Sequence, residues 1–166
     1  WAAAGYLGVL VRFRHHGDKE VTKLSHSGLV ILLNDVPVMW RSSKQPTSSL
    51  SPAEAEIYAL SEAVRASKHV SWVAEEMQVA VEWPLKIYCD NQQAISFQGE
   101  SCAKSKLKGC FDLREEWVSE MKNLDQVRVE YAMSEENKAD MLTKCLVKKA
   151  FLRAKAMMCT GFLGGT

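Results

Sequence analysis

Three carboxylates in this sequence stand where side chains often do chemistry. Glu56 lies in the second turn of the longest helical pattern, Asp90 follows a mostly apolar run that reads as a strand, and Asp140 lies near the start of a late helical segment. Clustered carboxylates repel one another, so a fold that gathers them needs a cation between them. Such oxygen ligands suit Mg²⁺ or Mn²⁺, and two of these ions can together hydrolyse a phosphodiester.

Each of the three residues also has an ordinary structural interpretation. Glu56 fits a solvated helix position, and Asp90 fits an N-cap over the residues that follow it. Asp140 fits a first-turn charge that the helix dipole favours. Taken alone, the spacing favours these structural roles, because any chain of 166 residues has enough acids to supply three.

The elements expected around these residues form a mixed α/β sheet. Apolar and alternating runs predict strands at 6–13, 28–33, 37–41, 85–89 and 127–132, and helical spacing predicts helices from 52 to about 81, at 92–97, at 111–124, from 139 onward and at 148–159. Three hairpin strands followed by strands alternating with helices indicate a five-stranded mixed sheet, an antiparallel meander plus two more strands, with helices packed on it. Ligands of such sheets bind at strand carboxyl ends, where Asp90 is expected.

Size and composition indicate one globular domain. Hydrophobic content of 47% and charged content of 25% are ordinary, and the net charge of +1 gives no overall field toward a polyanion. No apolar run is long enough to span a bilayer. The five cysteines are odd in number and form no Cys-x-x-Cys pair, which favours reduced thiols in an intracellular compartment, whether cytoplasm, nucleus or organelle. Because the chain begins with Trp rather than Met, we expect a fragment or a processed chain.

Four sequence motifs, three of which contain one of the carboxylates, form a wider pattern. WRSSKQPT at 40–47, LSPAEAEIYALSEA at 50–63, IYCDNQQAI at 87–95 and SEENKADMLTK at 134–144 resemble, in order and spacing, the ribonuclease H domain of copia-type LTR retrotransposon Gag-Pol polyproteins. The resemblance covers about residues 17–146. It implies a ribonuclease H-like fold, association with a reverse transcriptase, and Mg²⁺- or Mn²⁺-dependent hydrolysis of RNA in RNA:DNA hybrids.

By the same resemblance, Glu56, Asp90 and Asp140 match three of the family's four catalytic, metal-binding carboxylates. The fourth belongs at the end of the first strand, where this chain has the segment VRFRHH at 11–16 and no carboxylate. Asp18, the first acidic residue in the sequence, is the nearest candidate substitute acid. An arginine at that place would put a cation where a cation should bind, so we expect two-metal hydrolysis to be impaired.

Two functions therefore remain open. One is a retrotransposon-derived endonuclease that cuts RNA:DNA hybrids with reduced activity. The other is a catalytically inactive, domesticated module that serves as a structural or binding subunit of a larger assembly. If the first strand brings Arg12 or Arg14, rather than a carboxylate, against Asp90, the hydrolase hypothesis fails. The pattern divides the chain into a divergent first strand at 1–16, a ribonuclease H-like domain at 17–146 and a basic helix with a flexible tail at 147–166.

Several polar residues are weaker candidates for contacts with nucleic acid. They are Lys44, Gln45, Asn91, Lys104, Lys106 and Lys108. For the three loop lysines a solvated surface is the competing interpretation. The basic residues of the last helix, Lys148, Lys149, Arg153 and Lys155, are interpreted as a solvated helix face, and Trp40, Trp72, Trp83 and Trp117 are predicted to lie in the core.

Overall fold

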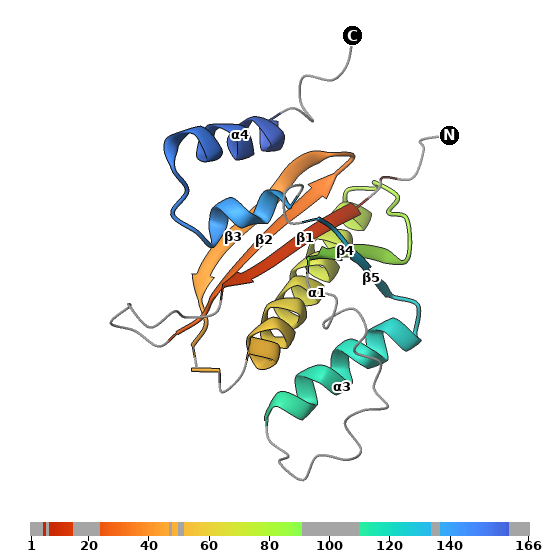
Figure 1. Cartoon of the computed structure of the whole chain (residues 1–166). Helices are drawn as coiled ribbons and strands as arrows, with labels where there is room; N and C mark the ends of the chain where they lie inside the picture. The colour runs from red at the N-terminus through yellow and green to blue at the C-terminus, as the bar shows by residue number, and fades with distance from the viewer. Residues whose placement is uncertain are drawn as a thin grey trace.

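A five-stranded mixed sheet forms the centre of the molecule (Figure 1). The computed structural model describes residues 5, 7–14, 24–46, 48–49, 52–90, 110–133 and 137–159. The strands are β1 (Leu7–Arg14), β2 (His26–Leu33), β3 (Val36–Lys44), β4 (Leu85–Cys89) and β5 (Val127–Tyr131). Their order is β3-β2-β1-β4-β5, so the first strand is the central one.

The strand directions confirm the predicted meander and mixed sheet. β1 pairs antiparallel with β2, and β2 pairs antiparallel with β3. β1 pairs parallel with β4, and β4 pairs parallel with β5. Both parallel connections pass through a helix, as parallel pairing requires a long crossover. The carboxyl ends of β1 and β4 consequently meet at one edge of the sheet.

Helices cover both faces of the sheet. On one face lie α1 (Pro52–Glu76) and α3 (Cys110–Asn123), whose apolar residues join the larger core cluster around Val9, Ile31 and Leu60. On the other face lie the 3₁₀ helix η2 (Lys138–Leu142) and α4 (Lys148–Cys159), which cover a smaller cluster around Leu10 and Val30. The alternation of strand residues divides them between the two clusters. No helix in the described part of the chain is long and apolar enough to cross a membrane.

The long helix ends earlier than its apolar spacing predicts. α1 stops at Glu76 rather than near residue 81. Gln78 adopts a φ of 59°, in the left-handed region, and the backbone N–H of Val79 donates to the carbonyl of Ala74 at 2.8 Å. This arrangement satisfies a carbonyl at the helix end and turns the chain toward the sheet. Val81 then bridges to Gly5 instead of continuing the helix.

Three of the predicted core tryptophans are exposed instead. The exposed fraction is 60% for Trp40, 56% for Trp72 and 37% for Trp83, so the core prediction is wrong for all three. Trp40 belongs to β3, an edge strand that the helices only partly cover. The helix predicted at 92–97 and the lysine loop at 99–109 lie outside the described residues.

Candidate functional site at the carboxyl ends of the central strands

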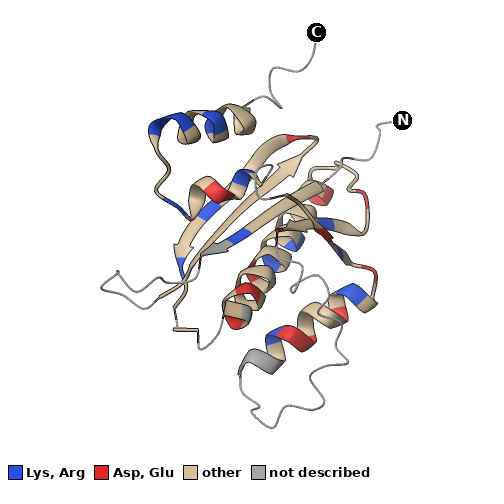
Figure 2. Ribbon diagram, in the orientation of Figure 1, with Lys and Arg blue, Asp and Glu red and all other residues tan. Residues whose placement is uncertain are grey.

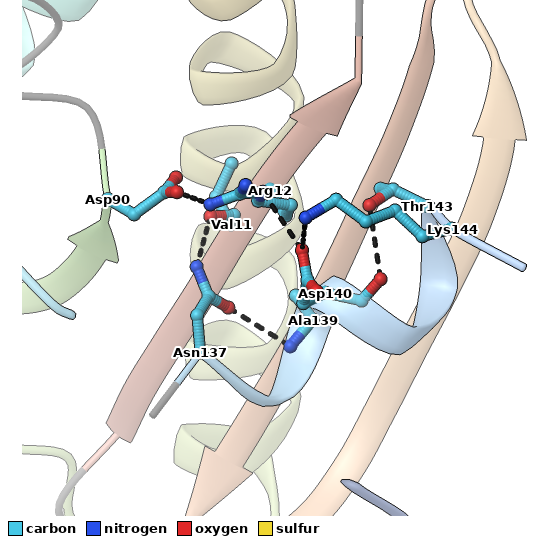
Figure 3. Close-up of polar contacts among 8 residues, drawn as sticks. All are labelled: Val11, Arg12, Asp90, Asn137, Ala139, Asp140, Thr143 and Lys144. Carbon is cyan, nitrogen blue, oxygen red and sulfur yellow. Dashed lines mark hydrogen bonds and ion pairs between the residues drawn. The ribbon is translucent and has the colours of Figure 1, made fainter. Parts of the chain in front are cut away.

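An arginine on the central strand reaches two of the three candidate carboxylates. Arg12 follows Val11, whose partner in the parallel register is Cys89, and Asp90 follows Cys89. Parallel pairing therefore sets Arg12 beside Asp90. Nη1 of Arg12 forms an ion pair with Oδ2 of Asp90, and its Nε lies 3.1 Å from Oδ1 of Asp140 (Figure 3).

These ion pairs are largely shielded from solvent. The side chains of Arg12, Asp90 and Asp140 are 15%, 11% and 22% exposed, so bulk water screens their charges less than it screens surface pairs. Asp140 has a second cation nearby, because Nζ of Lys144 lies 2.7 Å from its Oδ1. In this group of four, two positive charges face two negative charges.

Glu56 lies in the first half of α1, which packs on the face of the sheet opposite η2. Glu56 is 5% exposed. Burial raises the pKa of Glu56 from 4.5 to about 7, and the charge of Arg12 counteracts part of this rise. Arg12 thus acts electrostatically on all three candidate carboxylates.

Asn137 holds η2 against the central strand. Its Nδ2 donates to the carbonyl of Val11 at 2.9 Å, and its Oδ1 accepts from the backbone N–H of Ala139 at 3.0 Å (Figure 3). The side chain thereby caps η2 and ties it to the residue that precedes Arg12. Because Asn137 is buried, both bonds are protected from water. They place Asp140 over Arg12.

Gly28 provides the space for η2 to approach the sheet. It is the register partner of Arg12 on β2. A Cβ at this position would lie 2.9 Å from Cβ of Leu142, 2.9 Å from Cγ2 of Thr143 and 3.0 Å from the carbonyl oxygen of Ala139. Only a residue without a side chain fits this contact without moving η2.

We expect Gly28→Ala to lower the free energy of unfolding by about 1–3 kcal/mol through overpacking against η2. Thermal or denaturant unfolding would measure this loss. Thr143→Ser removes the methyl group that the new Cβ would meet, so the double variant should lose less than the sum of the two single changes. Strict additivity of the two changes would contradict the contact.

The residues at this site do not fit a divalent metal ion. A metal there would need Asp90 and Asp140 as oxygen ligands, but the guanidinium of Arg12 contacts both carboxylates. A second cation between them would meet direct repulsion. Among the residues that the structure describes, no group of three or more His, Cys, Asp or Glu side chains is arranged to hold a metal.

The weaker candidates for nucleic-acid contact differ in their exposure to solvent. Lys44 is exposed at the end of β3. Gln45 is only 1% exposed, and its Nε2 donates to Oγ of Ser27 at 2.9 Å and to the carbonyl of Ala55 at 2.8 Å. That geometry gives Gln45 a structural role in joining β3 to α1. The remaining candidates, Asn91, Lys104, Lys106 and Lys108, and the substitute acid Asp18 lie outside the described residues.

Sequence reasoning did not single out Asn137, Gly28 or Lys144. An asparagine directly before the Lys-Ala-Asp segment is a recognisable N-cap signal. The spacing of Asp140 and Lys144, four residues apart, likewise marks an ion pair on a helical turn. The close approach at Gly28 depends on a contact between segments more than 100 residues apart, which no local pattern reveals.

Sequence comparison finds relatives of the same kind that the four sequence motifs resemble. The chain is 29% identical over 144 residues to the Retrovirus-related Pol polyprotein from transposon TNT 1-94 of Nicotiana tabacum. It is 27% identical over 138 residues to that from transposon RE1 of Arabidopsis thaliana. These matches cover 86% and 81% of the chain but span only about a tenth of either polyprotein. No protein-family model matches the sequence.

Solved structures establish the fold. The chain superimposes on LC11-RNase H1, determined in complex with an RNA/DNA hybrid, with a TM-score of 0.57 and 15% identity, covering 90% of this chain and 99% of that one. The N-terminal RNase H domain of Rv2228c from Mycobacterium tuberculosis gives a TM-score of 0.55 and 13% identity, covering 92% and 97%. In sequence the chain is thus similar to copia-type retrotransposon Pol polyproteins, and in structure it has the ribonuclease H fold, as the ribonuclease H domain of a Gag-Pol polyprotein would.

Proposed function

We propose that this chain is a ribonuclease H-like domain that no longer performs two-metal hydrolysis and serves as a binding or structural module. The observation that carries the proposal is the position of Arg12, whose guanidinium contacts both Asp90 and Asp140. In this arrangement a side chain of the protein supplies the positive charge that the carboxylates need. The domain then keeps the ribonuclease H fold but binds no metal ion at this site.

The placement of the chain within a larger polypeptide is part of the same proposal. Its matches span about a tenth of retrotransposon polyproteins, and one structural neighbour was solved with an RNA/DNA hybrid. We propose nucleic acid or other subunits of an intracellular assembly as its partners. Residues 1–16 are proposed to be a divergent replacement for the original first strand, since β1 nonetheless occupies the centre of the sheet.

A second candidate is a hydrolase with reduced activity. The retention of Glu56, Asp90 and Asp140 supports it, because three of the four expected carboxylates are present. For this candidate Asp18 or another acid would have to supply the fourth carboxylate, and Arg12 would have to leave the other two. The two candidates therefore differ in whether cleavage depends on Asp90.

Cleavage of a hybrid carrying a labelled RNA strand, in Mg²⁺ and separately in Mn²⁺, distinguishes the candidates. We expect the natural protein to cleave no faster than Asp90→Asn, because Arg12 excludes the ion. Asp18→Asn serves as a second comparison. Metal-dependent cleavage that Asp90→Asn abolishes would overturn the proposal and establish the hydrolase, and its loss in Asp18→Asn as well would identify Asp18 as the fourth carboxylate. Circular dichroism of all three proteins would verify that each is folded.

A further inference from the structure

The charge of this nearly neutral chain is strongly segregated between the two faces of the sheet. From Lys138 to Cys159 there are six lysines and arginines and a single acidic residue, Asp140. The helices of the opposite face, α1 and α3, carry nine acidic residues and only four lysines and arginines. Figure 2 shows the same division, with blue and no red on α4 and mostly red on α1 and α3. Although the net charge of the chain is only +1, the face that carries η2 and α4 is therefore basic.

The basic side chains of α4 point into solvent. Lys148, Lys149, Arg153 and Lys155 are all exposed, while Met157 and Met158 on the inner side are partly buried. Among the acidic residues that the structure describes, none forms an ion pair with any of these four side chains. A solvated helix face, as the sequence predicts, would normally mix both signs of charge. Within the described ranges, no carboxylate pairs with the positive charges of α4.

Exposed aromatic side chains accompany this charge. Phe151 of α4 is 43% exposed and Trp40 of β3 is 60% exposed. Trp40 pairs in register with Val30, which belongs to the cluster that Met158 of α4 packs against, so Trp40 lies on the same face of the sheet as α4. By the alternation of β3, Lys44 projects to this face as well. Large exposed aromatics beside exposed cations are typical of surfaces that bind single strands.

We propose that this face, formed by α4 and the exposed part of β3 around Trp40, binds single-stranded nucleic acid. The lysines and arginine of α4 would contact successive phosphates, and Trp40 and Phe151 would stack on bases. Such binding uses no metal ion and none of the residues around Arg12. It therefore goes beyond the proposed loss of hydrolysis and does not depend on it.

Fluorescence anisotropy with a short fluorescein-labelled oligouridine strand, in EDTA, tests the proposal. The test variant is Lys149→Glu with Arg153→Glu, on one exposed side of α4. The control is Arg65→Glu with Arg128→Glu, two exposed residues on α1 and β5 that give the same change in net charge. We expect the α4 variant to lose about tenfold or more in affinity and the salt dependence of log Kd to fall by about 0.7 for each lost contact. The control should bind nearly as well as the natural protein.

A third variant separates stacking from charge. Trp40→Ala should weaken binding about fivefold or more while leaving the salt dependence unchanged, because stacking releases no counterions. An equal loss in the α4 variant and the control would overturn the proposal, since net charge alone would then explain binding. No binding by the natural protein would also overturn it, as would binding to phosphatidylserine vesicles without binding to oligouridine.

Discussion

Arg12→Ala is expected to lower the free energy of unfolding by about 3 kcal/mol or more, because the largely buried carboxylates that Arg12 contacts lose its compensating charge. Asp90 and Asp140, each less than a quarter exposed, would then face each other across the vacated space. Denaturant unfolding in EDTA measures the loss. Millimolar Mg²⁺ or Mn²⁺ should restore part of it in this variant, by binding the folded state, and should leave the natural protein unchanged.

Two controls make this result specific to the site. Arg41→Ala removes an arginine that also pairs with a carboxylate, Glu62 at 3.2 Å, but whose side chain is 49% exposed, so the loss should be below about 1 kcal/mol. Asp90→Asn added to Arg12→Ala should abolish the stabilisation by Mg²⁺. Stabilisation of the natural protein by Mg²⁺ to the same extent as Arg12→Ala would mean that Arg12 does not replace an ion.

The difference in free energy of unfolding between Glu56→Gln and the natural protein is expected to change by about 3 kcal/mol with pH. Burial raises the pKa of Glu56 to about 7, from 4.5, so the folded protein holds a proton that the unfolded chain releases between these values. The contribution of Glu56 to stability is therefore fully present below pH 4.5 and is lost as the pH rises through about 7, at 1.36 kcal/mol per unit of pKa shift. Glutamine keeps the shape and does not ionise.

Unfolding measured from pH 4 to pH 8 checks the sign as well as the size. The stability of Glu56→Gln relative to the natural protein should rise with pH across this window. Glu75→Gln replaces an exposed carboxylate on the same helix, and its difference from the natural protein should stay within about 0.5 kcal/mol throughout. A flat difference for Glu56→Gln as well would show that the carboxyl is hydrated in the folded state.

The sheet could be predicted from the sequence because each of its strands is a local apolar or alternating run. The β4 strand, for example, begins and ends at the predicted residues. The end of α1 was harder to predict, because apolar residues near Val79 continue the helical spacing although the backbone turns at Gln78. The exposure of Trp40 depends on strand order, which places β3 at an edge, and the composition of a strand does not encode its neighbours.

The candidate site was only partly predictable for a related reason. The types and order of Glu56, Asp90 and Asp140, together with the family resemblance, indicated the three candidate carboxylates. The resemblance also indicated that Arg12 stood where an acid was expected. The contacts that Arg12 makes, however, depend on the parallel pairing of β1 with β4 and on the anchoring of η2 by Asn137. These are contacts between distant segments, and only the assembled structure reveals them.

The central position of β1 also governs how the domain can acquire its structure during synthesis. β1 cannot complete its pairing until β4, which follows α1 in the chain, has been synthesised. The hydrogen bond from Asn137 to Val11 likewise joins residues 126 positions apart. On a ribosome, the meander can form early, but the sheet gains its fourth strand only after residue 89 has emerged. Such long-range closure is intrinsically slow. The apolar edge of β1 therefore stays open to other chains until the second half of the domain arrives.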